Sequence, residues 1–188
     1  MITTDDQLRI ANPIYQEVIP RELTYSTQLT ISHQSAWYVR DDGRLDLTAL
    51  LAAFQQFFRE HSAAWLERFA YREAGPQLLL QAFLQRIVNG GGRVEREYGL
   101  GRRRTDLCVI WPTATGVQRG VIELKLRTAS LERLLADGLA QTWAYADAMG
   151  AEEAHLVIFD QRPAVPWEAR IWRRSEPYHG RVITVWGM

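Results

Sequence analysis

Three charged residues interrupt apolar segments of the kind that form buried strands. Glu123 and Lys125 alternate with apolar neighbours, so a strand would place both charged side chains on one face. Asp106 opens a second apolar run, with sixteen residues between it and Glu123. The turn predicted at 112–116 would connect the two strands as a hairpin and bring the two carboxylates together.

Two adjacent carboxylates repel each other unless a cation lies between them. Hard oxygen ligands of this kind suit Mg²⁺ or Mn²⁺, with waters and substrate phosphates completing the coordination. The ammonium of Lys125 beside them would orient an attacking water or neutralise charge that develops on a phosphate. These residue types in this arrangement would suit metal-dependent hydrolysis of a phosphate ester.

Each of these residues also has a purely structural interpretation. Glu123 and Lys125 would be ordinary on an edge strand with one face in water. Asp106 would equally suit a cap at the start of a strand, or a partner for one of the arginines that precede it. The sequence alone leaves these alternatives open.

The surrounding pattern indicates an α/β fold that would position these residues. Two helices, from about residue 45 to 58 and from 63 to 69, precede a helix predicted at 77–88, which ends at a run of glycines. The remaining elements are predicted as follows: strands at 93–100, 105–111 and 120–126, a helix at 131–149 capped by Ser130 and ended by Gly150, and strands at 155–159, 169–173 and 182–186.

The order and spacing of these residues resemble a known superfamily. Asp106, followed after sixteen residues by Glu123-Leu124-Lys125, resembles the bipartite motif of the PD-(D/E)XK nucleases, with Thr105 in place of the motif's proline. Gln141 and Tyr145, one turn apart on the next helix, are similar to the Gln-x-x-x-Tyr element of the RecB-like exonucleases. The resemblance implies a restriction-endonuclease-like core: helix, three strands, helix and strand, with a mixed central sheet flanked by helices.

The chain looks closest to the C-terminal nuclease-like domain of bacterial AAA-ATPase-like proteins. Residues 81–84, 99–102 and 122–125 carry this resemblance, and residues 11–15 are similar to the segment that follows the ATPase core there. The implied organisation is a mostly helical extension at 1–69, resembling the end of an ATPase module, and a nuclease-like domain at 70–188. The sequence has no phosphate-binding loop of the G-x-x-x-x-G-K-[ST] type, so an ATPase would be a partner or a separate domain.

The resemblance also implies roles for particular residues. Asp106, Glu123, the backbone carbonyl of Leu124 and Glu73 would hold the metal, while Lys125 would act on the attacking water. Gln141 and Tyr145 would position the substrate or the lysine. Glu95 and Glu97 are the reserve candidates if Glu73 has only a capping or surface role. Arg102, Arg103 and Arg104 would hold flanking phosphates, although a merely solvated basic turn is the alternative.

Composition limits the function classes. Twenty-two basic and twenty-two acidic residues cancel, which gives no support for strongly basic, nonspecific nucleic-acid binding. Cys108 is the only cysteine, which excludes an internal disulfide and suits a cytoplasmic location. No segment is apolar enough for a membrane span. The expected function is a Mg²⁺- or Mn²⁺-dependent nuclease acting on DNA. The alternative is a catalytically silent module of the same fold that binds nucleic acid or regulates a partner ATPase, and the oligomeric state is left open.

Overall fold

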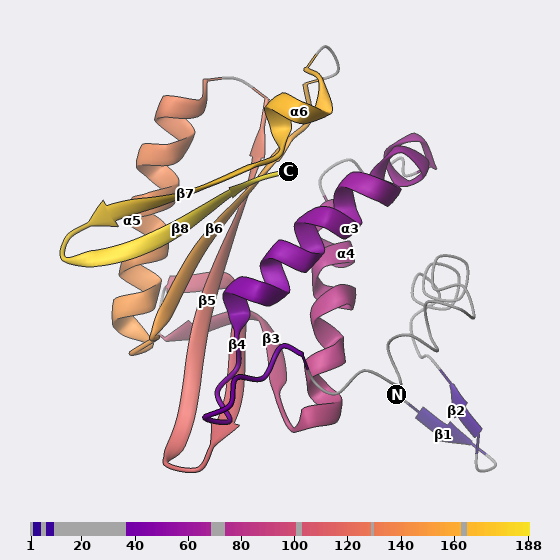
Figure 1. Ribbon diagram of the computed structural model, residues 1–188, viewed down its shortest axis with the longest axis vertical. Helices are drawn as coiled ribbons and strands as arrows, with labels where there is room; N and C mark the ends of the chain where they lie inside the picture. Colours follow the sequence, from indigo (N-terminus) through magenta and orange to yellow (C-terminus); the bar gives the residue numbers. More distant parts are fainter. Residues whose placement is uncertain are drawn as a thin grey trace. The chain divides into compact units, whose positions relative to one another are not determined.

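The computed structural model of the protein describes residues 2–4, 7–9, 37–68, 74–100, 103–128, 130–162 and 165–188 (Figure 1). Side chains are described for 37–60, 76–87, 91–96, 106–128, 130–162 and 165–188. The chain divides into two compact units, Met1–Trp37 and Tyr38–Met188. In the first unit, the strands β1 (Ile2–Thr4) and β2 (Gln7–Arg9) pair as an antiparallel hairpin.

The second unit is built on a mixed six-stranded sheet in the order β3-β4-β5-β6-β8-β7. β3, β4 and β5 form an antiparallel meander, β5, β6 and β8 run parallel, and β7 pairs antiparallel with β8. The strands span Arg93–Leu100 (β3), Arg103–Thr113 (β4), Gly116–Arg127 (β5), Glu153–Asp160 (β6), Trp172–Tyr178 (β7) and Arg181–Gly187 (β8).

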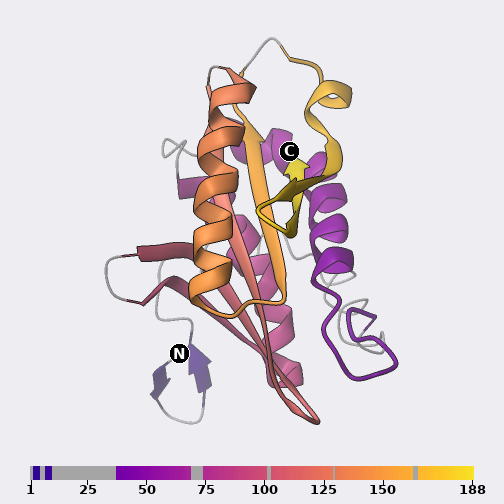
Figure 2. The ribbon, with the colours of Figure 1, turned by 90° about the vertical axis from the view of Figure 1, so that its left-hand side faces the viewer.

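Helices cover both faces of this sheet. α5 lies on one face, and α3 and α4 lie on the other, as Figure 2 shows with α5 in front of the strands. The helices span Leu47–Arg68 (α3), Ala74–Leu84 (α4), Leu131–Ala148 (α5) and Trp167–Arg170 (α6), and the 3₁₀ helix η1 spans Gln85–Gly90. The expected α/β class, with a mixed sheet flanked by helices, is therefore confirmed.

Alternation along the central strands separates the two apolar cores. Ile122 and Val157 pack on the α3 and α4 side, whereas Val121 and Leu156 pack on the α5 side. β6 is consequently apolar on both faces over most of its length, as expected for a strand buried between helical layers, whereas β5 carries Arg119, Glu123, Lys125 and Arg127 at the alternate positions that include Val121. Polar or charged side chains in such strands lose their contact with water, and the charges on β5 therefore need compensation.

The sequence predictions needed correction in three places. The two helices expected before residue 70 form one continuous helix, α3, which begins directly after Asp46. The Asp46 carboxylate caps this helix by accepting a hydrogen bond from the Ala49 amide at 2.8 Å. The helix expected at 77–88 ends at Leu84 and tightens into η1. The strand expected at 169–173 begins only at Trp172, because the short helix α6 precedes it. Within the described residues, no helix is long and apolar enough to cross a membrane.

Candidate active site at the ends of β4 and β5

The hairpin of β4 and β5 brings Asp106 and Glu123 to adjacent positions. Leu107 pairs with Ile122, and the two acidic residues each lie one position further along, toward the start of β4 and the end of β5. Both lie on the face that α5 covers, because their pleat neighbours Cys108 and Val121 pack there. β5 lies between β4 and β6, so the alternative of an edge strand is wrong.

Glu123 is a buried acid whose carboxylate is only partly hydrogen-bonded. It is 4% exposed, and its Oε2 atom is buried with no hydrogen-bond partner among the described residues. Burial raises the pKa of Glu123 from 4.5 to about 6, with a further contribution from the charge of Asp106; Lys125 opposes the rise. A buried carboxylate with an oxygen left unsatisfied is costly, and a cation near that oxygen would remove the cost.

Lys125 connects this acid to the covering helix. Its Nζ atom donates to Glu123 Oε1 at 2.7 Å and to Gln141 Oε1 at 2.5 Å. The Lys125 side chain is 23% exposed, whereas that of Glu123 is 5% exposed. The ammonium group therefore lies at the boundary between the buried carboxylate and solvent, oriented from two sides.

Asp106 is oriented by the backbone of β5. Its Oδ2 atom accepts a hydrogen bond from the Leu124 amide at 2.8 Å. Asp106 is only half-buried, and this bond fixes its carboxylate beside the Glu123-Leu124-Lys125 segment. The structure thus brings together four of the predicted residues: Asp106, Glu123, Lys125 and Gln141.

The other predicted residues are placed differently. Tyr145 is partly buried and packs against the apolar cluster beneath α5. Leu124 contributes its amide to Asp106, and its side chain packs on the opposite face of the sheet. Glu73 and Arg102 lie outside the described residues, and Arg103 and Arg104 lie in β4 with their side chains outside them.

The two reserve acids lie on the neighbouring strand. Glu95 pairs with Cys108, so it is on the α5 face, two residues from the level of Asp106. Arg96 pairs with Leu107 and Tyr98 with Thr105, which places the backbone of Glu97 opposite Asp106 in the register. Cys108 itself is fully buried, and burial raises the pKa of its thiol to about 11, as expected for an unreactive core cysteine.

A pair of charged residues that was not predicted from the sequence lies beside this site. Arg127 continues the alternation of Glu123 and Lys125 on β5, and it meets Asp160 at the end of the parallel strand β6. A usable signal was present, because Asp160 directly follows an apolar run and strand ends of a parallel sheet meet at one edge.

Comparison with protein-family models, with curated proteins and with solved structures found no match in any of the three.

Proposed function

We propose that this chain is a metal-dependent nuclease of the PD-(D/E)XK type, with DNA as its substrate. The observation that carries the proposal is the buried Glu123 carboxylate, whose Oε2 has no hydrogen-bond partner in the described structure while Oε1 holds Lys125. Asp106 lies beside it and contributes to its raised pKa. A pair of acids and a lysine arranged in this way suits phosphodiester hydrolysis better than it suits a structural role.

The donor set fits a hard divalent cation. Asp106 and Glu123 would hold Mg²⁺ or Mn²⁺, with the carbonyl of Leu124 as a further ligand. Mg²⁺ usually keeps several waters and binds through one or two carboxylates plus substrate oxygens. Among the described side chains, no group of three or more His, Cys, Asp or Glu residues could hold a metal, so waters and substrate oxygens would have to supply most of the coordination. When bound, the metal would supply Lewis-acid polarisation of the phosphate and lower the pKa of a bound water.

The protein's own residues would perform the remaining tasks. The Lys125 ammonium, held between Glu123 and Gln141, would orient the attacking water and stabilise the negative charge that builds up on the phosphate. Gln141 would keep Lys125 in place, since it accepts a hydrogen bond from the same ammonium. The Leu124 amide would keep Asp106 in one orientation.

The arrangement of elements supports the same proposal. α4, the meander β3–β4–β5, α5 and β6 follow one another in the order that the superfamily resemblance implies for a restriction-endonuclease-like core. The motif residues fall on β4, β5 and α5, on the single face that α5 covers. A bacterial ATPase domain as a partner, and a cytoplasmic location, are part of the same proposal.

The test is cleavage of linear, circular and single-stranded DNA in Mg²⁺ or Mn²⁺, comparing the wild type with Lys125→Ala. We expect metal-dependent cleavage that falls about 100-fold or more in the variant, because one preorganised charge at the reacting phosphate is removed. Circular dichroism should show the same fold, since Lys125 is partly exposed. Cleavage that persists in Lys125→Ala would reject the role given to this residue. Preference for circular or linear DNA would separate endonuclease from exonuclease action.

A second candidate is a catalytically silent module that binds nucleic acid or a partner ATPase. The observation in its favour is that only two carboxylates converge at the site among the side chains that the structure describes. This candidate predicts no uptake of Mg²⁺ or Mn²⁺ at Asp106 and Glu123, whereas the nuclease requires it.

A further inference from the structure

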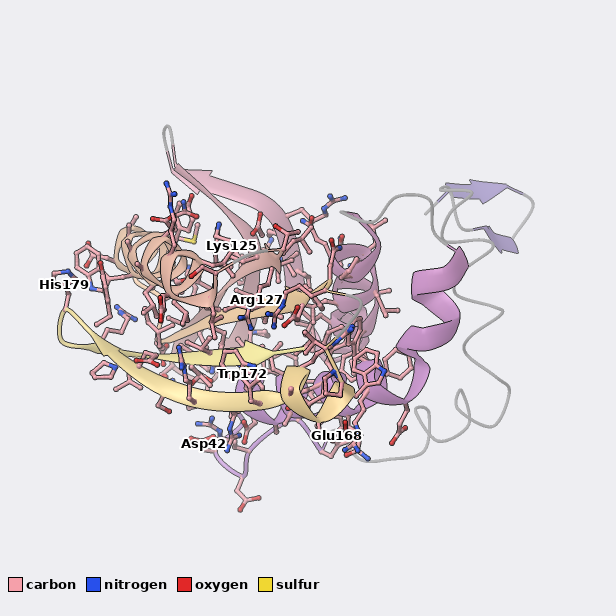
Figure 3. The ribbon with its side chains drawn as sticks, turned by 90° about the horizontal axis from the view of Figure 1, so that it is seen from above. Asp42, Lys125, Arg127, Glu168, Trp172 and His179 are labelled. Carbon is pink, nitrogen blue, oxygen red and sulfur yellow. The ribbon has the colours of Figure 1, made fainter. Side chains whose placement is uncertain are left out.

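β7 forms one edge of the six-stranded sheet. Among the described residues, β8 pairs with one side of β7 and no strand pairs with its other side. Arg173, Ser175 and Pro177 are exposed, so this unpaired edge lies at the surface. Figure 3 labels Trp172, where β7 begins, and His179, in the turn that follows its end. An exposed row of unpaired backbone groups is a ready template for pairing with another strand.

The β7–β8 hairpin determines which backbone groups of β7 face away from the sheet. The turn between the strands is His179-Gly180, whose residues both have positive φ, and Tyr178 and Arg181 flank it as a pair. In such hairpins the flanking residues exchange both backbone hydrogen bonds. Along the strand, residues of this kind alternate with residues whose amide and carbonyl groups point outward. Three residues of β7 share the outward orientation: Arg173, Ser175 and Pro177.

The sequence of β7 is complementary to itself when two copies run antiparallel. A two-fold axis at Ser175 places Arg174 opposite Glu176 of the second copy, and the reverse, by symmetry. The same axis places Trp172 opposite Tyr178. Within one chain, Arg174 and Glu176 already form an ion pair at 2.7 Å, with side chains that are 42% and 30% exposed. Pairing of two copies would therefore extend this ion pair into a network in which the charges alternate in sign across the strands.

Charge favours this register over its neighbours. An axis moved by one residue would place Arg174 opposite Arg174, or Glu176 opposite Glu176, and like charges directly opposite each other destabilise paired strands. Because Ser175 is an outward residue, its amide and carbonyl can bond to those of Ser175 in the second copy. Pro177 has no amide hydrogen, so its carbonyl would accept from the Arg173 amide without a return bond, and the ladder would end there.

We propose that β7 pairs antiparallel with β7 of a second copy of this chain, about a two-fold axis at Ser175, so that the two sheets become continuous. The interaction surface is the edge formed by residues 172–178. β6 and β8 lie between β5 and β7, so the contact does not include Asp106 or Glu123. The dimer is therefore independent of the proposed nuclease function, and each copy carries its own candidate active site.

Sedimentation velocity of the full-length chain, from about 1 to about 300 µM, tests this proposal. We expect reversible dimerisation with a Kd of about 10–100 µM, because a single pair of short strands buries less surface than a permanent dimer does. Arg174→Glu and Glu176→Arg should each weaken dimerisation about tenfold or more, since each variant places like charges opposite one another. The matched control is Arg133→Glu, the same charge reversal at an exposed arginine of α5, and it should dimerise as the wild type does.

Mixing the two variants distinguishes paired charges from a general effect of surface charge. An equimolar mixture of Arg174→Glu and Glu176→Arg should form a heterodimer with about the wild-type affinity, because each reversed charge then faces its opposite. Ser175→Pro removes the central outward amide and leaves the bonds to β8 in place, so this variant should be monomeric.

Circular dichroism checks the fold of each variant; should a charge variant unfold, Ser175→Pro decides the question. Three results would each overturn the proposal: a wild type that stays monomeric at about 300 µM, a mixture that associates no better than either variant alone, or a folded Ser175→Pro that dimerises as the wild type does.

Discussion

The metal-free protein should lose stability as the pH rises through 6, because of Glu123. The pKa of this carboxyl is raised from 4.5 to about 6 by burial and by the charge of Asp106. The folded state therefore binds the Glu123 proton more tightly than the unfolded state does. The resulting stabilisation is fully present below pH 4.5 and is lost as the pH rises through about 6.

The size of this effect follows from the difference in pKa. A difference of one pKa unit corresponds to about 1.4 kcal/mol, so Glu123 accounts for about 2 kcal/mol of unfolding free energy across the whole range. About 1 kcal/mol of this falls between pH 5 and pH 7.5, where the protein can be measured without extensive protonation of its other acids. The exposed fraction of Glu123 is only 4%, so solvent screens little of the effect.

Urea unfolding of the wild type and of Glu123→Gln, both in EDTA, isolates this contribution. The unfolding free energy of the wild type minus that of Glu123→Gln should decrease by about 1 kcal/mol from pH 5 to pH 7.5, since the other titrating groups are common to both proteins. Saturating Mg²⁺ should abolish the decrease, because a bound cation keeps the carboxylate ionised. A difference that stays constant over this range in EDTA would refute the assignment of Glu123 as a destabilised buried acid.

Two further predictions concern the groups around this acid. Gln141→Ala should lower kcat about tenfold with little change in KM, because Lys125 loses one of the two acceptors that orient it; the exposed Asp147→Ala on the same helix is the control, and equal rates for the two variants would contradict this role. Gly187→Ala should lower the unfolding free energy by about 1–3 kcal/mol, because its Cβ would overlap the Trp172 indole and come within 2.5 Å of the Arg170 carbonyl oxygen. An unchanged urea midpoint for Gly187→Ala would show that this end of the sheet can relax.

Local patterns in the sequence predicted the elements that hold the site. Alternation around Glu123 assigned both charged residues of β5 to one face, and the turn at 112–116 predicted the hairpin that brings Asp106 close. These features depend only on neighbouring residues within one strand or one hairpin. A hydrophobic period of two and a turn signal are therefore sufficient to predict them. Helix α5 was predicted for the same reason, and its observed bounds, Leu131–Ala148, differ from the prediction by one residue.

Long-range pairing was not readable from such patterns. β8 lies between β6 and β7 in the sheet. This order depends on which apolar strand pairs with the edge of β6 that faces away from β5. The position of Asp160 after an apolar run indicated the sheet edge at which it lies, but its contact with Arg127 also depends on the parallel register of β5 and β6, which no local pattern specifies. Within α3, the helical pattern weakens after residue 58, where the sequence suggested a break; the backbone continues the helix to Arg68.

Calorimetric titration of the EDTA-stripped protein with Mn²⁺ would show whether Asp106 and Glu123 form a divalent cation site. We expect one site in the wild type at pH 7.5, at least tenfold weaker binding in Asp106→Asn, which removes one of two charged ligands, and wild-type binding in Arg174→Ala. Absence of Mn²⁺ uptake by the wild type, or equal affinity in Asp106→Asn, would contradict this expectation.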